Sequence, residues 1–174
     1  MPSWPIAIAV LDVLGYISTI LLIVSLVYGV YLSISGFLPV LIRLGAGLKK
    51  RKIAIFAKGD SLNSLQALFK DSNLFNSRNV IPITSVSDLG RAEMASVFLV
   101  YWPDWIEHLP QILTCKKDRT ALIIYAPQGE GSLPNESILL LEQHRNVVLA
   151  NLRGRLLNDI VISLITTGYE KKPN

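Results

Sequence analysis

Apolar residues are distributed along this chain in two different ways. From Ile6 to Leu48 they form an almost unbroken run that holds only two charged residues, Asp12 and Arg43. After Lys49, short apolar runs alternate with segments that carry charges every few residues. The pattern predicts an apolar N-terminal segment followed by a globular domain of ordinary composition.

The apolar segment is long enough to cross a membrane. Val13 to Ile34 is a stretch of 22 residues without a charge. As a helix it would be about 33 Å long, and the hydrocarbon core of a bilayer is about 30 Å thick. We therefore expect residues 1–35 to form a transmembrane helix in a lipid bilayer. A tight hairpin of two spans that turns near Gly29 remains an alternative.

Residues 36–50 link this span to the domain. Gly36 and Pro39 interrupt a helix, so we expect an interfacial or re-entrant segment here. It leads into a basic cluster formed by Lys49, Lys50, Arg51 and Lys52. No Lys or Arg precedes the span, so the positive-inside bias predicts a cytoplasmic C-terminal domain. We expect the anchor to lie in the inner (plasma) membrane.

Small residues recur at four-residue intervals within the expected span, at Ser25, Gly29 and Ser33. Such a stripe lets two helix backbones approach each other closely. The sequence therefore favours a homo-oligomer that packs through these positions.

Residues 51–174 alternate between two kinds of segment. Apolar runs rich in β-branched residues occupy residues 52–57, 79–84, 96–102, 120–126 and 146–151, and helix-like segments occupy 61–72, 85–95, 104–114, 135–144 and 155–169. Continuous apolar strands are typical of a parallel sheet that is covered on both faces. We expect an α/β fold, a doubly wound and mostly parallel five-stranded sheet in the flavodoxin-like order 2-1-3-4-5.

The charges exclude one class of function. The chain has a net charge of +4 and a mean hydropathy of +0.42. After residue 52, however, twelve Lys and Arg residues balance twelve Asp and Glu residues. A protein that binds duplex nucleic acid spreads cations over a face to neutralise many phosphates. We therefore expect no direct binding of duplex nucleic acid.

Candidate ligand-binding residues lie in the loops after the expected strands, because ligands of such sheets bind at the carboxyl ends of the strands. They are Lys58, Gly59, Asp60 and Ser61 after the first strand, Trp102, Asp104 and Trp105 after the third, Gln128 and Gly129 after the fourth, and Arg153 and Arg155 after the fifth. A nucleotide-like ligand or a protein partner would suit this edge.

Each of these groups has a second interpretation. The stretch "KGDS" opens a helix and suits an anion, but Asp60 or Ser61 as an ordinary N-cap is favoured. Arg153 and Arg155, with Lys58 beside them, could hold a phosphate, or they could be solvated charges. The two indoles could stack on a base, dock on a partner, or fold back over the following helix.

No catalytic constellation and no metal-ligand spacing is evident. We expect no metal and no cofactor, and a protein that is not an enzyme is favoured. Its single cysteine also excludes an intrachain disulfide.

The expected domain resembles the Rossmann-type modules related to TIR domains. In TIR NAD-hydrolases a Trp and a Glu begin the helix after the third strand, and "DWIEHL" supplies Trp105 and Glu107 at that place. The resemblance implies Glu107 as a candidate catalytic acid. A membrane-tethered TIR-like hydrolase of NAD or a nucleotide is therefore an alternative function.

The whole plan, a span followed directly by a cytoplasmic Rossmann-like domain, is similar to membrane effectors of bacterial antiphage systems, of the retron or CRISPR and cyclic-nucleotide type. This resemblance implies an effector or signalling protein that senses a ligand or partner, oligomerises and perturbs the membrane in abortive infection. A structural partner subunit of a membrane complex, docked through the Trp loop, is a third alternative.

Overall fold

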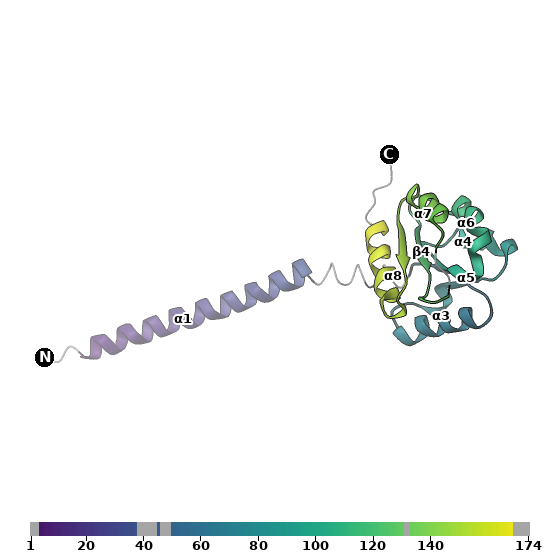
Figure 1. Ribbon diagram of the computed structural model, residues 1–174. Coiled ribbons are helices and arrows are strands. Elements are labelled where there is room, and N and C mark those ends of the chain that lie inside the picture. Colours follow the sequence, from purple (N-terminus) through teal and green to yellow (C-terminus); the bar gives the residue numbers. More distant parts are fainter. Residues whose placement is uncertain (1–3, 38–44, 46–49, 131–132, 169–174) are drawn as a thin grey trace. The chain divides into compact units, whose positions relative to one another are not determined.

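The computed structural model describes residues 4–37, 45, 50–130 and 133–168. The chain divides into two compact units, Met1–Gly45 and Ala46–Asn174. The first is a long helix and the second is an α/β domain (Figure 1).

The N-terminal unit is built on helix α1 (Trp4–Leu32), which continues into a π-helical turn, η1 (Ser33–Phe37). Within it, Leu11–Gly36 is long and apolar enough to span a membrane. Every one of these side chains is exposed. The hairpin alternative is wrong, because Gly29 lies inside the uninterrupted helix α1.

Most of the expected interfacial segment cannot be compared with the structure. Residues 38–44 and 46–49, which include Lys49 of the basic cluster, lie outside the described residues. Lys50 is exposed, whereas Arg51 and Lys52 are half-buried. The interfacial segment and the orienting role of the cluster therefore stay predictions.

The domain contains a five-stranded, all-parallel sheet in the order β2-β1-β3-β4-β5, as the sequence predicts. The strands are β1 (Ile53–Phe56), β2 (Val80–Ile83), β3 (Val97–Tyr101), β4 (Ala121–Tyr125) and β5 (Val147–Ala150). In the central strands, Ile55 pairs with Leu99, which pairs with Ile123. All three side chains are fully buried. Burial on both faces of the sheet explains why these strands are continuously apolar in sequence.

Helices cover both faces of the sheet (Figure 1). Helices α3 (Gly59–Ser72) and α8 (Arg153–Gly168) pack on one face through Leu65, Phe69 and Ile160. The other face is covered by the short helices α4 (Leu89–Ala92), α5 (Trp102–Trp105), α6 (Leu109–Cys115) and α7 (Asn135–Glu142). The domain is thus a three-layer, doubly wound α/β fold.

Prolines account for two local features of this architecture. Pro82 lies in β2, an edge strand, where a missing backbone donor is tolerated. The single helix expected over residues 104–114 is broken into α5, a 3₁₀ turn η4 (Ile106–His108) and α6. Pro110 lies in the first turn of α6, where its ring and missing N–H do no harm, and it prevents a longer helix through this point.

Two further 3₁₀ turns flank the second strand, η2 (Ser77–Asn79) before it and η3 (Val86–Asp88) after it. The helix expected over residues 85–95 is reduced to η3 and the four residues of α4.

Candidate functional site at the carboxyl edge of the sheet

The strand order reverses direction between β1 and β3. The chain leaves β1 toward α3 on one face and leaves β3 toward α5 on the other. The crevice at such a switch point is the usual ligand site of an open α/β sheet. A cavity of about 410 Å³ lies here, and we call it the switch-point cavity. It is lined by Asp60, Ser61, Ser64, Leu65, Tyr101, Tyr125, Pro127, Glu130 and Arg153.

Helix α3 begins at this cavity, but not as the sequence predicts. Asp60 and Ser61 are residues of the first helical turn, and the N-cap position is held by Lys58. Gly59 has a φ of +51°, which a residue with a side chain rarely adopts, so a glycine is favoured at this turn. The N-cap prediction is wrong because the chain turns into the helix two to three residues earlier.

No side chain caps the start of α3. The amide of Lys58 instead donates a hydrogen bond to Oδ2 of Asp104, at 2.7 Å. Asp104, in the loop after β3, therefore holds the loop after β1 in place. The turn that this bond stabilises presents Asp60 and Ser61 to the cavity.

Arg153 reaches the cavity from the start of α8. Its Nη1 donates to Oγ of Ser64 at 2.6 Å, and its Nη2 donates to the carbonyl oxygen of Ser64 at 3.0 Å. These two bonds hold the guanidinium against α3. A guanidinium carries five N–H groups, so donors are left for a ligand.

Two tyrosines lie at the ends of neighbouring strands. Tyr101 ends β3 and Tyr125 ends β4, and the two pair in the sheet with their ring centroids 6.0 Å apart. The hydroxyl of Tyr101 donates a hydrogen bond to Oε2 of Glu130. Burial raises the pKa of Tyr101 above its usual value, and the bond to Glu130 raises it further. Burial likewise raises the pKa of Tyr125, against the opposing charge of Arg153. Both phenols are therefore protonated donors at neutral pH.

The charges that line the switch-point cavity are mixed. Arg153 supplies one cation, and Asp60 and Glu130 supply two carboxylates. A ligand that fits this set presents one anionic group to Arg153 and offers hydrogen-bond donors, such as hydroxyls, to the carboxylates. A ligand with several negative charges would be repelled.

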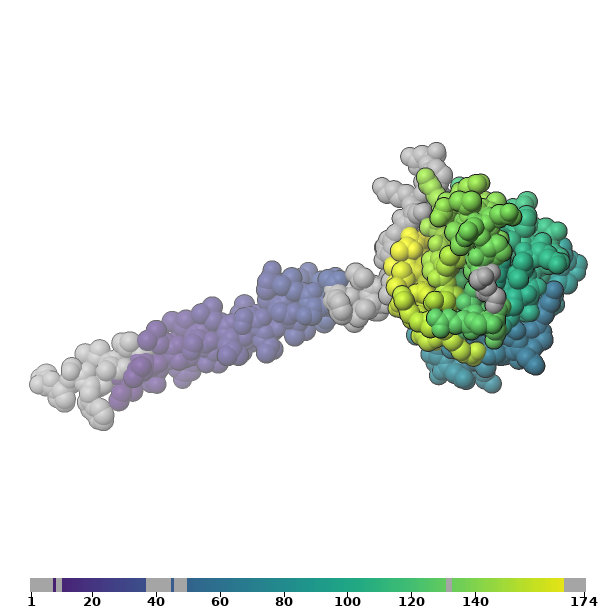
Figure 2. Space-filling model, viewed as in Figure 1, coloured from purple at the N-terminus to yellow at the C-terminus, as the bar shows by residue number. Residues whose placement is uncertain are grey.

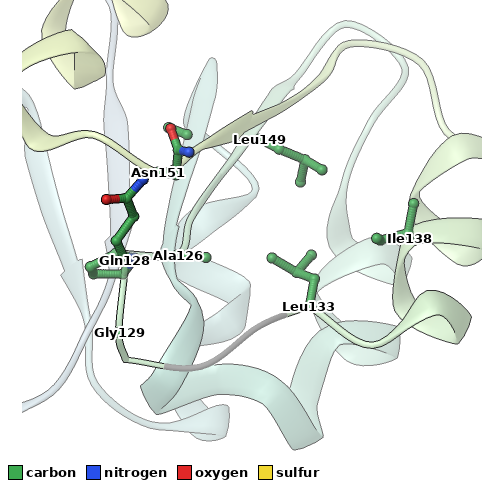
Figure 3. A pocket seen from close by; sticks show the side chains of 9 residues that line it. Ala126, Gln128, Gly129, Leu133, Ile138, Leu149 and Asn151 are labelled. Atoms are coloured by element: carbon green, nitrogen blue, oxygen red, sulfur yellow. The ribbon is translucent and has the colours of Figure 1, made fainter.

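A second and larger cleft opens on the other side of the loop after β4, and we call it the β5 cleft (Figure 3). Its volume is about 710 Å³. Leu133, Ile138 and Leu149 point into it, with the amide side chains of Gln128 and Asn151 beside them. The remaining lining residues are Ala126, Pro127, Gly129 and Ala150. Both volumes lie in the range of about 300–1,000 Å³ that is typical of small-molecule sites.

The two tryptophans of the loop after β3 are not available to a ligand or a partner. Trp102 and Trp105 are completely buried in the core on the α6 side of the sheet. The ring of Trp105 packs edge-on against Phe56, with their centroids 5.4 Å apart. Of the three interpretations of these indoles, the structure agrees with packing under the following helix. Their Nε1 atoms have no hydrogen-bond partner among the described residues.

The three cations of the rim do not come together. Arg153 lines the switch-point cavity, but Nζ of Lys58 lies 5.3 Å from the centroid of the Trp105 ring. Arg155 is exposed and lines neither cavity. Of the two interpretations of these cations, the exposed Arg155 agrees with a solvated charge, whereas Arg153 lines the switch-point cavity.

Glu107 lies in the 3₁₀ turn η4, exposed to solvent, and it lines neither cavity. Within the described part of the chain, no group of three or more His, Cys, Asp and Glu side chains could hold a metal ion.

Sequence reasoning missed several residues that line the cavities from strands, a helix surface and loops: Ser64, Tyr101, Tyr125, Glu130, Leu149 and Asn151. One signal was present. Tyr101 and Tyr125 are polar-tipped residues at the carboxyl ends of two adjacent central strands, which is where ligands of this fold bind.

Comparisons of the chain with protein-family models, with curated proteins and with solved structures found no significant match.

Proposed function

We propose that this protein is a membrane-anchored effector or signalling protein whose α/β domain binds a nucleotide-like ligand in the switch-point cavity. The observation that carries the proposal is the position and lining of this cavity. It lies at the switch point of the sheet, and its polar side chains converge from the ends of two strands, two helices and a loop. A cavity at the switch point that is lined by a small number of convergent polar groups is the expected form of a ligand site.

The lining supports a ligand built from a sugar and a single phosphate. Arg153 is held by Ser64 in a position to meet a phosphate. Glu130 and Asp60 can accept hydrogen bonds from ribose hydroxyls, a role that acidic residues have in dinucleotide-binding folds. The excess of carboxylates over guanidinium groups disfavours a triphosphate.

The N-terminal unit supplies the membrane part of the proposal. Helix α1 has the length and composition of a span, and the basic cluster after it favours an inner-membrane anchor with the domain in the cytoplasm. Ser25, Gly29 and Ser33 are exposed on α1, and a side chain added at Gly29 would meet no atom within 4 Å. This open stripe supports self-association in the membrane, and through it a perturbation of the bilayer when the ligand binds.

The two alternative functions have less support. A hydrolase that uses Glu107 would need that carboxylate in a cavity, and a partner subunit docked through the Trp loop would need exposed indoles. Neither is found. A protein partner that docks on another surface of the α/β domain would still be compatible with the membrane anchor.

The proposal is tested with the full chain reconstituted in liposomes that contain a self-quenching dye. We expect at least one of the four common ribonucleoside monophosphates to increase dye release. Arg153→Gln should abolish this increase. Arg155→Gln should leave it unchanged, because that residue lies on the same helix but outside the cavity. Release that no nucleotide changes, or that both variants change alike, would contradict the proposal.

A further inference from the structure

The α/β domain has a second surface that the function proposed above does not use. The domain is a rounded body in the space-filling view (Figure 2). Helices cover both faces of its sheet, so the loops at the two ends of the strands form opposite surfaces. We call the loops that precede the strands the amino edge. It comprises residues 50–52, 76–79, 93–96, 116–120 and 143–146.

Hydrogen bonds join most of these loops into one continuous surface. The amide of Ser96 donates to the carbonyl oxygen of Lys52 at 2.8 Å, and the amide of Ala121 donates to that of Ser96 at 3.0 Å. Nζ of Lys116 donates to the carbonyl oxygen of Arg145 at 2.7 Å. The loops before β1, β3, β4 and β5 therefore hold one another in place.

The charges of the domain are sorted between the two edges. The amino edge carries eight cations and two carboxylates. The last turn of α3 and the end of α7 add Lys70, Asp71 and Glu142, which leaves nine cations against four carboxylates. The loops that follow the strands carry three cations and five carboxylates. Those loops are residues 57–61, 84–88, 102–107, 126–130 and 151–155.

Most cations of the amino edge are accessible to a partner. The exposed ones are Lys50, Arg78, Lys117, Arg119 and Arg145. A cation beside the last turn of a helix is favoured by the helix dipole, and this explains Lys116, directly after α6. It does not explain Arg119, three residues further along. The amino edge therefore has a surplus of positive charge that suits an anionic partner.

Exposed apolar side chains lie among these cations. Met94 is 63% exposed, and its Sδ lies 3.9 Å from Nζ of Lys52. Leu74, between α3 and β2, is 43% exposed. Cations with apolar side chains among them suit the interface of an anionic bilayer, where the apolar groups enter the headgroup region. The phosphates of a nucleic acid would satisfy the cations alone, so the composition of this edge favours a lipid surface.

The length of the chain keeps the amino edge within reach of the bilayer that α1 is expected to span. The apolar stretch ends at Gly36, and Lys50 is fourteen residues further along. Such a segment can extend over at most about 50 Å. A tethered surface meets its partner at a high effective concentration, so individually weak contacts are sufficient.

We propose that the amino edge of the sheet docks on the anionic headgroups of the membrane in which the chain is anchored. Each exposed cation near an anionic bilayer favours docking by about fivefold. Docking turns the carboxyl edge, and with it the switch-point cavity, away from the lipid and toward the solvent. This inference rests on the membrane anchor of the proposed function, and it does not depend on what the cavity binds.

The test measures how close each edge lies to the lipid headgroups. The full chain is reconstituted in vesicles whose headgroups carry a spin label, which quenches a dye at short range. In a Cys115→Ser background, the dye is attached at Gln143→Cys on the amino edge or at Gln128→Cys on the carboxyl edge, both of them exposed positions. In vesicles of phosphatidylcholine and phosphatidylglycerol, only the dye at position 143 should be quenched. Vesicles of phosphatidylcholine alone, or high salt, should remove the quenching.

The dependence on salt allows one cation to be tested at a time. At the salt concentration where the parent chain loses half of its quenching, docked and undocked chains are equal in number. Arg145→Gln should lower the ratio of docked to undocked chains by about fivefold there, so that quenching falls to about a third of its value. The matched control, Arg155→Gln, removes an exposed cation of the carboxyl edge and should leave the quenching unchanged.

Equal quenching at the two positions, quenching that does not require phosphatidylglycerol, or equal effects of Arg145→Gln and Arg155→Gln would overturn the docking surface. A single-stranded RNA oligonucleotide serves as the competing partner. If it binds the chain in phosphatidylcholine vesicles and Arg145→Gln weakens that binding, while phosphatidylglycerol causes no quenching, the amino edge is a nucleic-acid site and the proposal is wrong.

Flotation of the vesicles separates this inference from the proposed function. A chain that floats with the vesicles but is not quenched at position 143 overturns the docking surface and leaves the proposed function standing. A chain that floats with vesicles of neither composition has no membrane anchor, and the proposed function and this inference then fail together.

Discussion

Arg153 and Ser64, which are far apart in the sequence, are joined by two hydrogen bonds across the carboxyl edge of the sheet. Nη1 and Nη2 of the arginine donate to Oγ and to the carbonyl oxygen of the serine at 2.6 and 3.0 Å. The contact links the start of α8 to α3, and it fixes the one cation among the described residues of the switch-point cavity before any ligand arrives. Such preorganisation reduces the entropy that binding would otherwise cost.

The first prediction concerns this link. Ser64→Ala removes the acceptor of Nη1, and the loss of one such bond corresponds to about 0.5–1.5 kcal/mol. We expect affinity for a nucleoside monophosphate to fall by about two- to twelvefold, as measured by calorimetry. Asn63→Ala, at an exposed neighbouring position on α3, is the control and should have no effect. Equal affinities of the two variants would contradict a positioning role for Ser64.

The second prediction concerns the Tyr101 phenol. Because burial and the Glu130 carboxylate raise its pKa, the phenol ionises at a higher pH in the folded than in the unfolded chain. The ordinary pKa of a tyrosine is 10.0. Below that pH the protonated phenol makes its full contribution to folding stability, and the contribution is lost as the pH rises through the higher pKa of Tyr101 in the folded chain. Glu130→Gln should lower the pKa of Tyr101.

The measurement is an absorbance titration of phenolate in the full chain, with Tyr101→Phe used to identify the signal. Gln replaces Glu130 without its charge, so the titration of Tyr101 should move toward lower pH. A titration that does not move would show that Glu130 does not act on this phenol.

The third prediction concerns the buried tryptophans. Replacing Trp105 by Ala opens a cavity beside Phe56 and should lower the free energy of unfolding of the domain by about 3–5 kcal/mol. Ile106→Ala, at the adjacent and 44% exposed position, should change it by no more than about 0.5 kcal/mol. Denaturant unfolding followed by circular dichroism gives both values. Similar effects of the two substitutions would argue against a core role for this loop.

The fourth prediction concerns the span. Arginines at Leu22 and Leu26, one turn apart near the middle of the apolar stretch Leu11–Gly36, should oppose membrane insertion by about 3–4 kcal/mol each. The double variant should leave the membrane fraction under alkaline extraction, and a double Ile variant at the same positions should stay in it. A wild-type chain that is itself extracted would rule out an integral anchor.

Much of the domain can be predicted from its sequence because parallel strands buried on both faces are continuously apolar. Ile53–Phe56 and Ala121–Tyr125 are examples, and the 2-1-3-4-5 order follows from alternating strands and helices. The break at Pro110 was also visible in the sequence, but helical spacing of the flanking leucines favoured one continuous helix. The proline rule was the stronger signal there.

The site was harder to predict than the fold. Arg153 and Arg155 look equivalent in the sequence, yet residues two apart on a helix point in directions about 200° apart, so only one of them can face the cavity. The burial of Trp102 and Trp105 depends on tertiary packing, which a loop sequence with a proline and an aspartate does not reveal. Tyr101 and Tyr125 end apolar runs that predict strands, and nothing in those runs indicates that both residues line the switch-point cavity.

The most direct measurement for the central claim is the binding of a ribonucleoside monophosphate to the full chain and to two arginine variants in detergent micelles. We predict saturable binding by the wild type, a loss of at least about tenfold in Arg153→Gln, which removes a charge-assisted contact, and unchanged affinity in Arg155→Gln. Equal affinities of the two variants, or no binding by the wild type, would contradict the assignment of the switch-point cavity as the ligand site.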